Sequence, residues 1–305
     1  MHKQLHKDQQ QHEIKAQLIY LIMQIRMDHP TMSLRSMYYK IKPEGIGRDR
    51  FEFLCTDWGL MLEKKKNYRV TTDSSGVIRF PNLIASIKLT RINQVWVSDI
   101  TYYEMNDRFY YLTFISDMFS KMIKGYSVSS NLRTVNTTIP ALRLALKLFR
   151  LEQDLILHSD GGGQYYSTEF LAITSSFGIT NSMAKAAYEN PQAERVNGII
   201  KNNYLKHWNP KQEWQLLKMV DKSVYLFNYE KPHKSLKYST PYEFENKFTF
   251  EADNLSKAKS RQRQNRATYG ASSPSVAGQP VSDSDVSPAK SKYKTSLNLS
   301  TNIRH

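Results

Sequence analysis

The chain has 305 residues, which is enough for about two domains of ordinary size and for a buried core. Its one cysteine, Cys55, excludes an internal disulfide framework and a four-cysteine zinc site. The 43 Lys and Arg residues outnumber the 28 Asp and Glu residues, so the net charge of +15 favours a polyanionic partner. The sequence has no run of about 18 apolar residues and no signal-peptide pattern at its start, so we expect a protein of the reducing cytoplasm without a membrane segment.

Residues 1–70 have the pattern of a small, basic helical domain. The first predicted helix carries apolar residues at helical spacing on one face: Ile14, Leu18, Leu21, Ile22 and Ile25. His29 and Pro30 end it. Ser33 is the candidate N-cap of a second, short helix, which residues 43–45 break.

A third helix is predicted to open at Asp49 and to end before Gly59. Its inner face holds Phe51, Leu54, Cys55 and Trp58. Three short helices with tight turns are typical of a helix-turn-helix unit, although a helical domain that never touches DNA has the same pattern. The candidate DNA-contacting residues are Arg48, Arg50, Lys64, Lys65 and Lys66.

After a predicted linker over residues 71–90, residues 91–250 combine strand and helix patterns. Three β-rich stretches, 94–105, 108–119 and 122–129, come first, with Asn106 and Asp107 as a turn signal. Helices are predicted over 134–150, 167–177, 192–208 and 213–229, and strands over 155–160 and 179–183. This order predicts an α/β fold with a mixed sheet flanked by helices. Residues 251–305 hold 11 serines and few large apolar side chains, which predicts a disordered basic tail that either contacts DNA loosely or is inert.

Three carboxylates stand out by position. Asp99 lies within a predicted strand, Asp160 closes a buried strand before three glycines, and Glu194 begins a long helix. A carboxylate in an apolar strand is costly unless it is paired or bound to metal. Three such acids can converge into an oxygen-only site for Mg²⁺ or Mn²⁺, although each alone can also be a surface residue or a local cap.

Several ordered segments carry a resemblance: VWVSDITYY, YLTFISDMFSKMIKGYSV, HSDGGGQYYSTEF, AERVNGIIK and FNYEKPHKSLKYSTPYEF. Together they resemble the integrase-type transposases of the insertion-sequence-three family, specifically its second-frame catalytic protein. The match runs from about Ile14 to Phe248, and the segment GRDRFEFLCTDWGL resembles the helix-turn-helix region that precedes the family's core.

The resemblance implies a ribonuclease-H-like core in which Asp99, Asp160 and Glu194 bind two Mg²⁺ or Mn²⁺ ions. It also implies that Lys201, two helical turns after Glu194, lies along the DNA phosphates. The 33 residues between Asp160 and Glu194 form a slightly shorter segment than the family usually has, which we interpret as a trimmed loop. Asp117 matches a family position that we interpret as structural. His158 precedes Asp160 by two residues and points to the same side of the strand, so it either contacts substrate or metal or supports the site from behind.

The expected function is DNA cleavage and strand transfer of an insertion sequence, through a copy-out, paste-in cycle. The expected partners are the element ends and target DNA, a second copy of the chain and an upstream-frame protein, at the bacterial nucleoid. One alternative is a catalytically decayed protein that only binds terminal repeats; another is a nuclease acting on hybrids. Tyr102, Tyr103, Tyr110, Tyr111, Tyr165 and Tyr166 form an aromatic set that serves either the core or stacking on unpaired bases.

Overall fold

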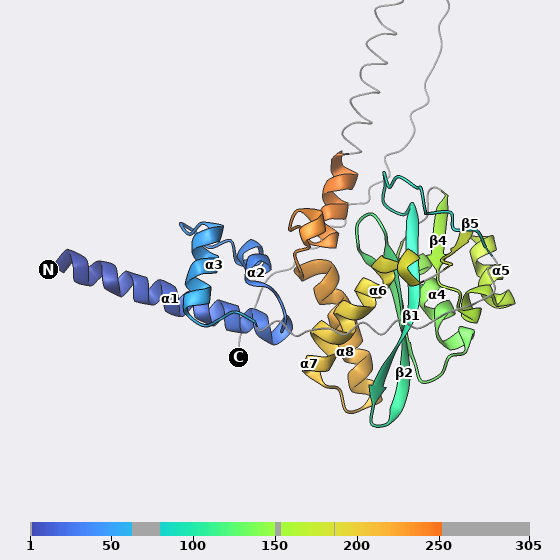
Figure 1. Ribbon diagram of the computed structural model, residues 1–305, viewed down its shortest axis with the longest axis horizontal. Coiled ribbons are helices and arrows are strands. Elements are labelled where there is room, and N and C mark those ends of the chain that lie inside the picture. The colour runs from blue at the N-terminus through green and yellow to red at the C-terminus, as the bar shows by residue number, and fades with distance from the viewer. Residues whose placement is uncertain (1, 63–79, 150–153, 186, 252–305) are drawn as a thin grey trace, which may run out of the picture. The chain divides into compact units, whose positions relative to one another are not determined.

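The computed structural model describes residues 2–62, 80–149, 154–185 and 187–251 (Figure 1). The predictions for Lys64, Lys65 and Lys66, for most of the linker and for the tail after Glu251 lie outside the described residues. Within these described ranges, no helix is both long and apolar enough to cross a membrane.

Three helices form the N-terminal part: α1 (His2–Asp28), α2 (Leu34–Ile41) and α3 (Arg48–Asp57). They share one small core, made of Leu18, Ile22, Met32, Met37, Phe51 and Cys55. Ser33 caps α2 as predicted, because its side chain accepts a hydrogen bond from the backbone N–H of Ser36. Gly59 adopts a positive φ of 70° just after α3.

Two details of this part differ from the sequence prediction. Ile14 and Leu21 are exposed, at 46% and 43%, because the small core takes up only the stripe of α1 through Leu18 and Ile22. Gly47 is the N-cap of α3, and Asp49 lies within the first turn of that helix, where its negative charge meets the positive end of the helix dipole.

Five strands form one mixed sheet in the order β3-β2-β1-β4-β5. The strands are β1 (Val95–Met105), β2 (Arg108–Asp117), β3 (Ile123–Ser129), β4 (Leu155–Ser159) and β5 (Ile179–Met183). β1, β2 and β3 are antiparallel, whereas β4 pairs parallel with β1 and with β5. Asn106 and Asp107 make the β1–β2 turn with positive φ at both positions, as a two-residue hairpin requires. The sheet confirms the predicted α/β fold with a mixed sheet.

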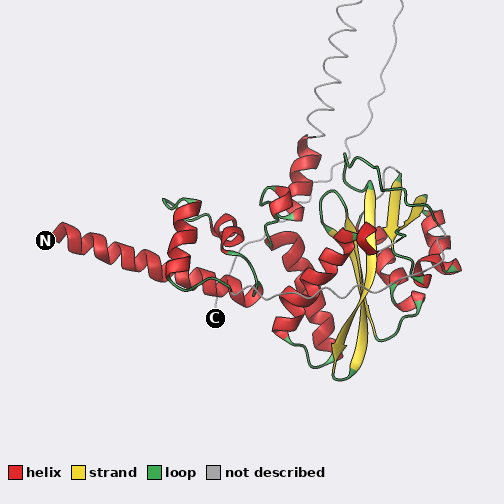
Figure 2. Ribbon diagram, in the orientation of Figure 1, coloured by secondary structure: helices red, strands yellow, loops and turns green. Residues whose placement is uncertain are grey.

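Helices cover both faces of this sheet (Figure 2). α4 (Thr138–Leu148) and α5 (Thr168–Ser176) pack on the face that includes Trp96 and Ile115. The other face is covered by α6 (Pro191–Gly198), its π-helical continuation Ile199–Leu205, α7 (Lys206–Trp208), α8 (Glu213–Tyr225) and the π-helical segment Leu226–Glu230. Short 3-10 helices occupy Thr134–Asn136, Gly163–Tyr166, Ala187–Glu189 and Lys234–Leu236.

Two outer segments are fastened to the sheet. Ahead of β1, the backbone N–H of Leu83 donates to Ser182 Oγ of β5, and Ile84 is buried in a cluster with Val95 and Val97. At the other end, residues 241–251 form a helix. Its Glu245 accepts hydrogen bonds from Lys124 Nζ and Ser120 Oγ, so it holds that helix against the β2–β3 connection and β3.

Candidate active site

Asp99 and Asp160 lie next to each other because of the register between β1 and β4. The two strands are parallel, and Ser98 of β1 is paired with Ser159 of β4. Asp99 directly follows Ser98, and Asp160 directly follows Ser159. Both acids therefore lie at the edge of the sheet where the pairing of β1 with β4 ends. The structure thus brings together two of the three predicted acids.

Burial disfavours the charged form of both acids, and the charge of Asp160 also disfavours that of Asp99. Burial, together with the negative charges of Asp160 and Glu194, raises the pKa of Asp99 to about 7. Burial also raises the pKa of Asp160, while the backbone N–H of Gly162, 3.1 Å from Asp160 Oδ1, and a hydrogen bond with the Asp99 side chain lower it. Two half-buried acids this close together form a site at which a cation would lower the electrostatic free energy of their charged forms.

Glu194 lies in the first turn of α6, where its side chain is exposed. Its charge acts on Asp99, so the two carboxylates are neighbours in electrostatic terms. Within the described ranges, however, no three acidic, histidine or cysteine side chains are close enough to hold a metal ion. Glu194 of α6 is therefore near Asp99 and Asp160 but does not form a three-ligand metal site with them.

Hydrogen bonds fix α6 to the sheet on both sides of Glu194. Asn197 Nδ2 donates to Asp99 Oδ2 at 2.8 Å, and Asn190 Nδ2 donates to the backbone oxygen of Ser98 at 2.9 Å. Gln192 donates to the backbone oxygen of Asp117 and accepts from Lys121 Nζ. The sequence analysis missed Asn197, although its position three residues after Glu194 puts it on the same helical face.

Asp117 has a structural role, in agreement with its interpretation from the sequence. Its side chain is fully buried. Its two carboxylate oxygens accept hydrogen bonds from the backbone N–H groups of Asn93, Phe119 and Ser120 at 2.6–2.8 Å. These bonds close the turn after β2 and leave the carboxylate satisfied by the backbone.

Behind the acid pair lies a buried polar contact that the sequence did not predict. Tyr165 and Ser98 share a hydrogen bond of 2.8 Å between their hydroxyl oxygens. Burial raises the pKa of Tyr165, and the charges of Asp160 and Asp99 raise it further, so its hydroxyl stays protonated. His158 is fully buried and pairs through Nδ1 with Ser182 Oγ of β5, which makes it a packing residue between the two parallel strands.

Lys201 lies in the π-helical continuation of α6. Its Nζ donates to the backbone oxygen of Tyr102 at 3.1 Å and sits 5.0 Å from the centre of the Tyr102 ring. Burial and Lys206 lower the pKa of Lys201, whereas Asp99 raises it. The Lys201 ammonium group is therefore close enough to Asp99 to interact with it electrostatically.

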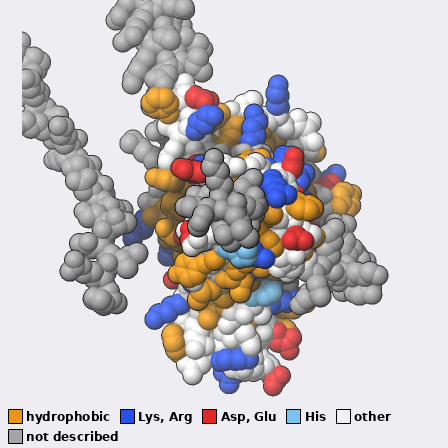
Figure 3. All heavy atoms as spheres, turned by 90° about the vertical axis from the view of Figure 1, so that its left-hand side faces the viewer, with side chains coloured by type: hydrophobic (Ala, Val, Ile, Leu, Met, Phe, Trp, Pro, Cys, Tyr) orange, Lys and Arg blue, Asp and Glu red, His pale blue; other side chains and the backbone are white. Residues whose placement is uncertain are grey.

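The two predicted arginines of the N-terminal part are exposed on α3. The Arg48 guanidinium pairs with Asp49 at 2.7 Å, and Arg50 lies 5.5 Å from the centre of the Phe53 ring. On the face drawn in Figure 3, Lys and Arg side chains are spread out with Asp and Glu side chains between them. On that face, the positive charge is therefore dispersed.

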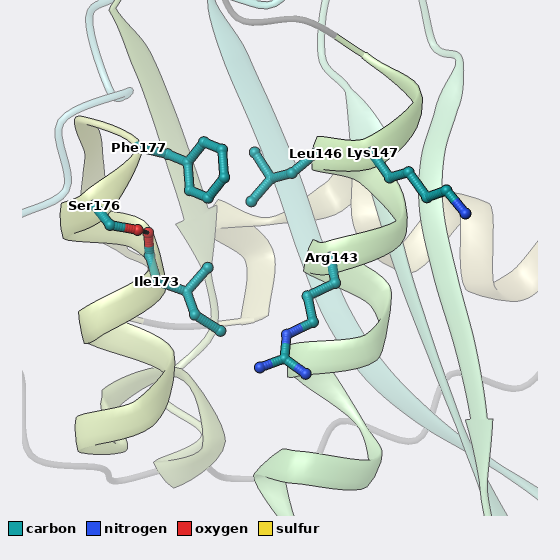
Figure 4. Close-up of a pocket in the computed structure, with 6 residues that line it drawn as sticks. All are labelled: Arg143, Leu146, Lys147, Ile173, Ser176 and Phe177. Carbon is teal, nitrogen blue, oxygen red and sulfur yellow. Dashed lines mark hydrogen bonds between the residues drawn. The ribbon is translucent and has the colours of Figure 1, made fainter.

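A shallow pocket of about 350 Å³ lies between α4 and α5 (Figure 4). Arg143, Leu146 and Lys147 come from α4, and they face Ile173, Ser176 and Phe177 at the end of α5. None of these residues belongs to the predicted acid site. The pocket is a separate surface feature, which the sequence did not indicate.

The chain matches two family models, both described as an integrase core domain. One model covers residues 90–188 and the other residues 178–241. The first span includes Asp99 and Asp160, and the second includes Glu194 and Lys201. The matched segment therefore holds all three acids and their neighbouring lysine.

Curated relatives of the chain come from insertion elements. The uncharacterized 31 kDa protein of insertion element IS600 from Shigella sonnei is 29% identical over 79% of this chain and 90% of its own length. The putative transposase InsK of IS150 from Escherichia coli is 30% identical over 60% of this chain and 65% of its own length. The HTLV-2 integrase catalytic core, solved with magnesium, has 26% identity and a TM-score of 0.42, over 50% of this chain and 96% of that one.

Further similarity is found with the transposase for insertion sequence element IS629 of Shigella sonnei, at 29% identity over 62% of this chain and 66% of that protein. The relatives thus come from insertion elements, and this chain also matches the integrase core models. The chain is therefore similar to transposases of insertion elements, and the segment that matches known family models is an integrase core domain.

Proposed function

We propose that this transposase cuts DNA at the ends of an insertion sequence and joins the freed 3′-hydroxyl to a second phosphodiester, with Asp99, Asp160 and Glu194 as its catalytic acids. The observation that carries the proposal is the convergence of Asp99 and Asp160 at one edge of the sheet. A structural pair of acids would gain nothing from mutual repulsion and burial, whereas a metal-dependent site gains cation affinity from both.

The donor groups fit a hard divalent cation. All three side chains offer carboxylate oxygens, which Mg²⁺ and Mn²⁺ prefer, and burial and mutual repulsion raise the pKa of Asp99. Asp99 and Asp160 would hold the first ion, and Glu194 would complete the set for two ions by turning its exposed side chain toward the pair. Bound ions supply activation of the attacking oxygen and stabilisation of the leaving oxygen.

The chain's own groups would position the reacting DNA. The Asn197 amide holds one Asp99 oxygen, which fixes the direction in which the other oxygen points. The Gly162 N–H group does the same for Asp160. Lys201 supplies a cation for a DNA phosphate beside the acids, and Arg48 and Arg50 of α3 are proposed to contact the terminal repeats.

The proposed partners are the element ends and target DNA, a second copy of the chain on that DNA, and the upstream-frame protein of the element. The net charge of +15 supports the DNA partner. The proposed place of action is the bacterial nucleoid within the cytoplasm.

A strand-transfer assay on DNA that carries the flanking element ends tests the proposal. We expect Mg²⁺-dependent cleavage and joining by the unchanged chain and loss of both, by at least a hundredfold, in Glu194→Gln. Glu169→Gln, an equally conservative change of an exposed acid in the first turn of α5, is the matched control and should keep full activity.

The alternative of a decayed DNA-binding protein predicts a different result. The unchanged chain and Glu194→Gln would then bind the element ends equally, and neither would cleave them after addition of the upstream-frame protein. Cleavage of RNA–DNA hybrids without any joined product would instead support a nuclease.

A further inference from the structure

Two aromatic side chains next to the acid site are exposed. Tyr102 of β1 is 60% exposed and Phe109 of β2 is 50% exposed. Their rings meet edge to face, with centroids 5.5 Å apart and an interplanar angle of 88°. Their sequence neighbours Tyr103 and Tyr110 are buried, at 9% and 6%, as core positions of the same strands. The exposed pair is therefore not part of the hydrophobic core.

This pair lies where β1 has one open edge. β4 pairs with β1 only over Val95–Ser98, and in the described ranges no other strand takes over along β1 from Asp99 onward. The backbone oxygen of Tyr102 receives its hydrogen bond from Lys201 Nζ instead of from a strand. The same ammonium group lies 5.0 Å from the centre of the Tyr102 ring, so it joins the aromatic pair to the acid site.

The three features lie in order along this edge. Tyr102 follows Asp99 by three residues, which is about 10 Å along an extended strand. Alternation of side chains puts the Tyr102 ring on the sheet face opposite to the Asp99 carboxylate, with Lys201 at the edge between them. A DNA strand that crosses the edge would meet the acids, then the cation and then the ring. About 10 Å corresponds to about three nucleotides at B-DNA spacing.

The charges around the aromatic pair indicate which part of the DNA would contact each side chain. Lys201 offers a cation to a phosphate, whereas exposed Glu104, directly opposite Phe109 in the β1–β2 register, would repel a phosphate. The aromatic pair between them has no charge of its own and presents an exposed ring face. A base, rather than the backbone, is the part of DNA that matches this surface.

We propose that Tyr102, supported from the side by Phe109, stacks on an unpaired base of the DNA strand within about three nucleotides of the reacting phosphodiester. Lys201 contacts the phosphate that leads into this base. The inference rests on the proposed function, because it takes the acid site as the place where the DNA strand is cut.

The test measures binding without catalysis. The full chain, in buffer without divalent cations, is titrated with fluorescently labelled element-end DNA whose last three base pairs are mismatched. Base stacking predicts that Tyr102→Ala binds roughly 5- to 150-fold more weakly, at an unchanged dependence on salt. Tyr102→Phe keeps the ring and should bind within about twofold of the unchanged chain.

Two control variants separate stacking from other causes. Phe177→Ala removes another exposed phenyl group, on the far α4–α5 surface, and should not change binding. Lys201→Ala should lower the slope of log affinity against log salt by about one, because it removes one phosphate contact. A 2-aminopurine at one of the three mismatched positions should change its emission on binding to the unchanged chain and not to Tyr102→Ala.

Equal binding by Tyr102→Ala and the unchanged chain would overturn the inference, and so would equal losses in Tyr102→Ala and Tyr102→Phe. A change of oligomeric state in Tyr102→Ala without a change in DNA affinity would also overturn it, and would assign the patch to a second copy. The proposed function is judged by a separate measurement. DNA cleavage by the unchanged chain supports the proposed function, whatever the affinity of Tyr102→Ala. If the unchanged chain never cleaves DNA but Tyr102→Ala binds it more weakly, the result supports base stacking and contradicts the proposed function.

Discussion

The side-chain amide of Asn197 donates a 2.8 Å hydrogen bond to Oδ2 of Asp99. Asn197 lies three residues after Glu194, so the helix that carries the third acid also orients the first one. Asn190 anchors the same helix to the backbone of Ser98, the residue before Asp99. The geometry of the acid site is therefore set by the way α6 is fastened to β1.

Replacement of Asn197 by Ala should slow DNA cleavage at saturating DNA and leave the affinity for DNA nearly unchanged. A hydrogen bond to a charged group contributes about 1.5–3 kcal/mol, which corresponds to about a 10- to 150-fold loss of rate if the Asp99 carboxylate loses its orientation. Single-turnover cleavage and DNA titrations measure the two quantities. Asn202→Ala, on an exposed position of the same helix, is the control. An equal loss in both variants would contradict a positioning role for Asn197.

Asp99 should lower the stability of the metal-free protein at neutral pH. Its pKa is raised from an ordinary value near 3.8 to about 7, so the fold favours the protonated form. The stabilising contribution of protonated Asp99 is complete below pH 3.8 and is lost as the pH rises through about 7. Asp99→Asn should therefore be more stable than the unchanged chain at pH 8 by on the order of 2 kcal/mol, and much less so at pH 4.

Urea unfolding at the two pH values, with a chelator present, measures this difference. Asp107→Asn is the matched control, because Asp107 is an exposed turn residue with positive φ, a conformation that Asn adopts readily. A stability gain in Asp99→Asn that is the same at both pH values would argue against the charge as its cause.

Divalent cations should stabilise the folded chain through the same acids. A ligand that binds only the folded state at a hundred times its dissociation constant adds about 2.7 kcal/mol. We expect Mg²⁺ or Mn²⁺ to raise the melting temperature of the unchanged chain and a chelator to reverse the rise. In Asp160→Asn the rise should largely disappear, and in Glu169→Gln it should remain. A rise of equal size in Asp160→Asn would place the bound ion elsewhere.

The Lys124–Glu245 ion pair should be necessary for stability. Lys124 is completely buried, lies 2.6 Å from Glu245 and stacks 4.0 Å from the centre of the Phe149 ring. Removal of one partner leaves an uncompensated buried charge, so Glu245→Gln should cost about 3–5 kcal/mol of unfolding free energy. Glu251→Gln, which breaks the exposed Lys247–Glu251 pair, should cost at most about 0.5 kcal/mol. Urea denaturation compares the two variants, and similar costs would contradict the argument.

Gly125 is required by the close packing of α4 on β3. A Cβ atom at this position would overlap the backbone oxygen of Ala141 and come within 2.9 Å of the Ala145 nitrogen, both in helix backbone that cannot move aside locally. We expect Gly125→Ala to destabilise the protein by about 1–3 kcal/mol. Gly163→Ala, whose Cβ would have no atom within 4 Å, should change the stability far less. Thermal unfolding of the two variants measures the difference.

Local patterns in the sequence determined most of the fold. Strand β5 occupies the predicted residues Ile179–Met183, and β1 lies within the predicted stretch, because alternating and β-branched residues favour strands wherever one face is buried. Ser33 caps its helix as expected, since a cap depends on only three neighbouring residues. Asp99 and Asp160 could be selected for a similar reason, because a carboxylate in an apolar strand or at its end needs a function or a partner. Glu194 begins a helix, and the resemblance to a family was needed to assign it as the third acid.

Contacts between distant residues decided what the sequence left open. Tyr102 and Tyr103 have the same chemistry, yet one is exposed and the other is buried, because they point to opposite faces of the sheet and the π-helical segment Ile199–Leu205 covers the Tyr103 face. Ile14 and Leu21 fit the apolar face of α1, but the core of Leu18, Ile22 and their neighbours is too small to cover them. The pairing of Asp99 with Asp160 depends on the β1–β4 register, and Asn197 meets Asp99 only because α6 packs on that strand. Local sequence determines which backbone conformations are favourable, whereas burial and side-chain partners depend on which segments of the folded chain occupy the neighbouring space.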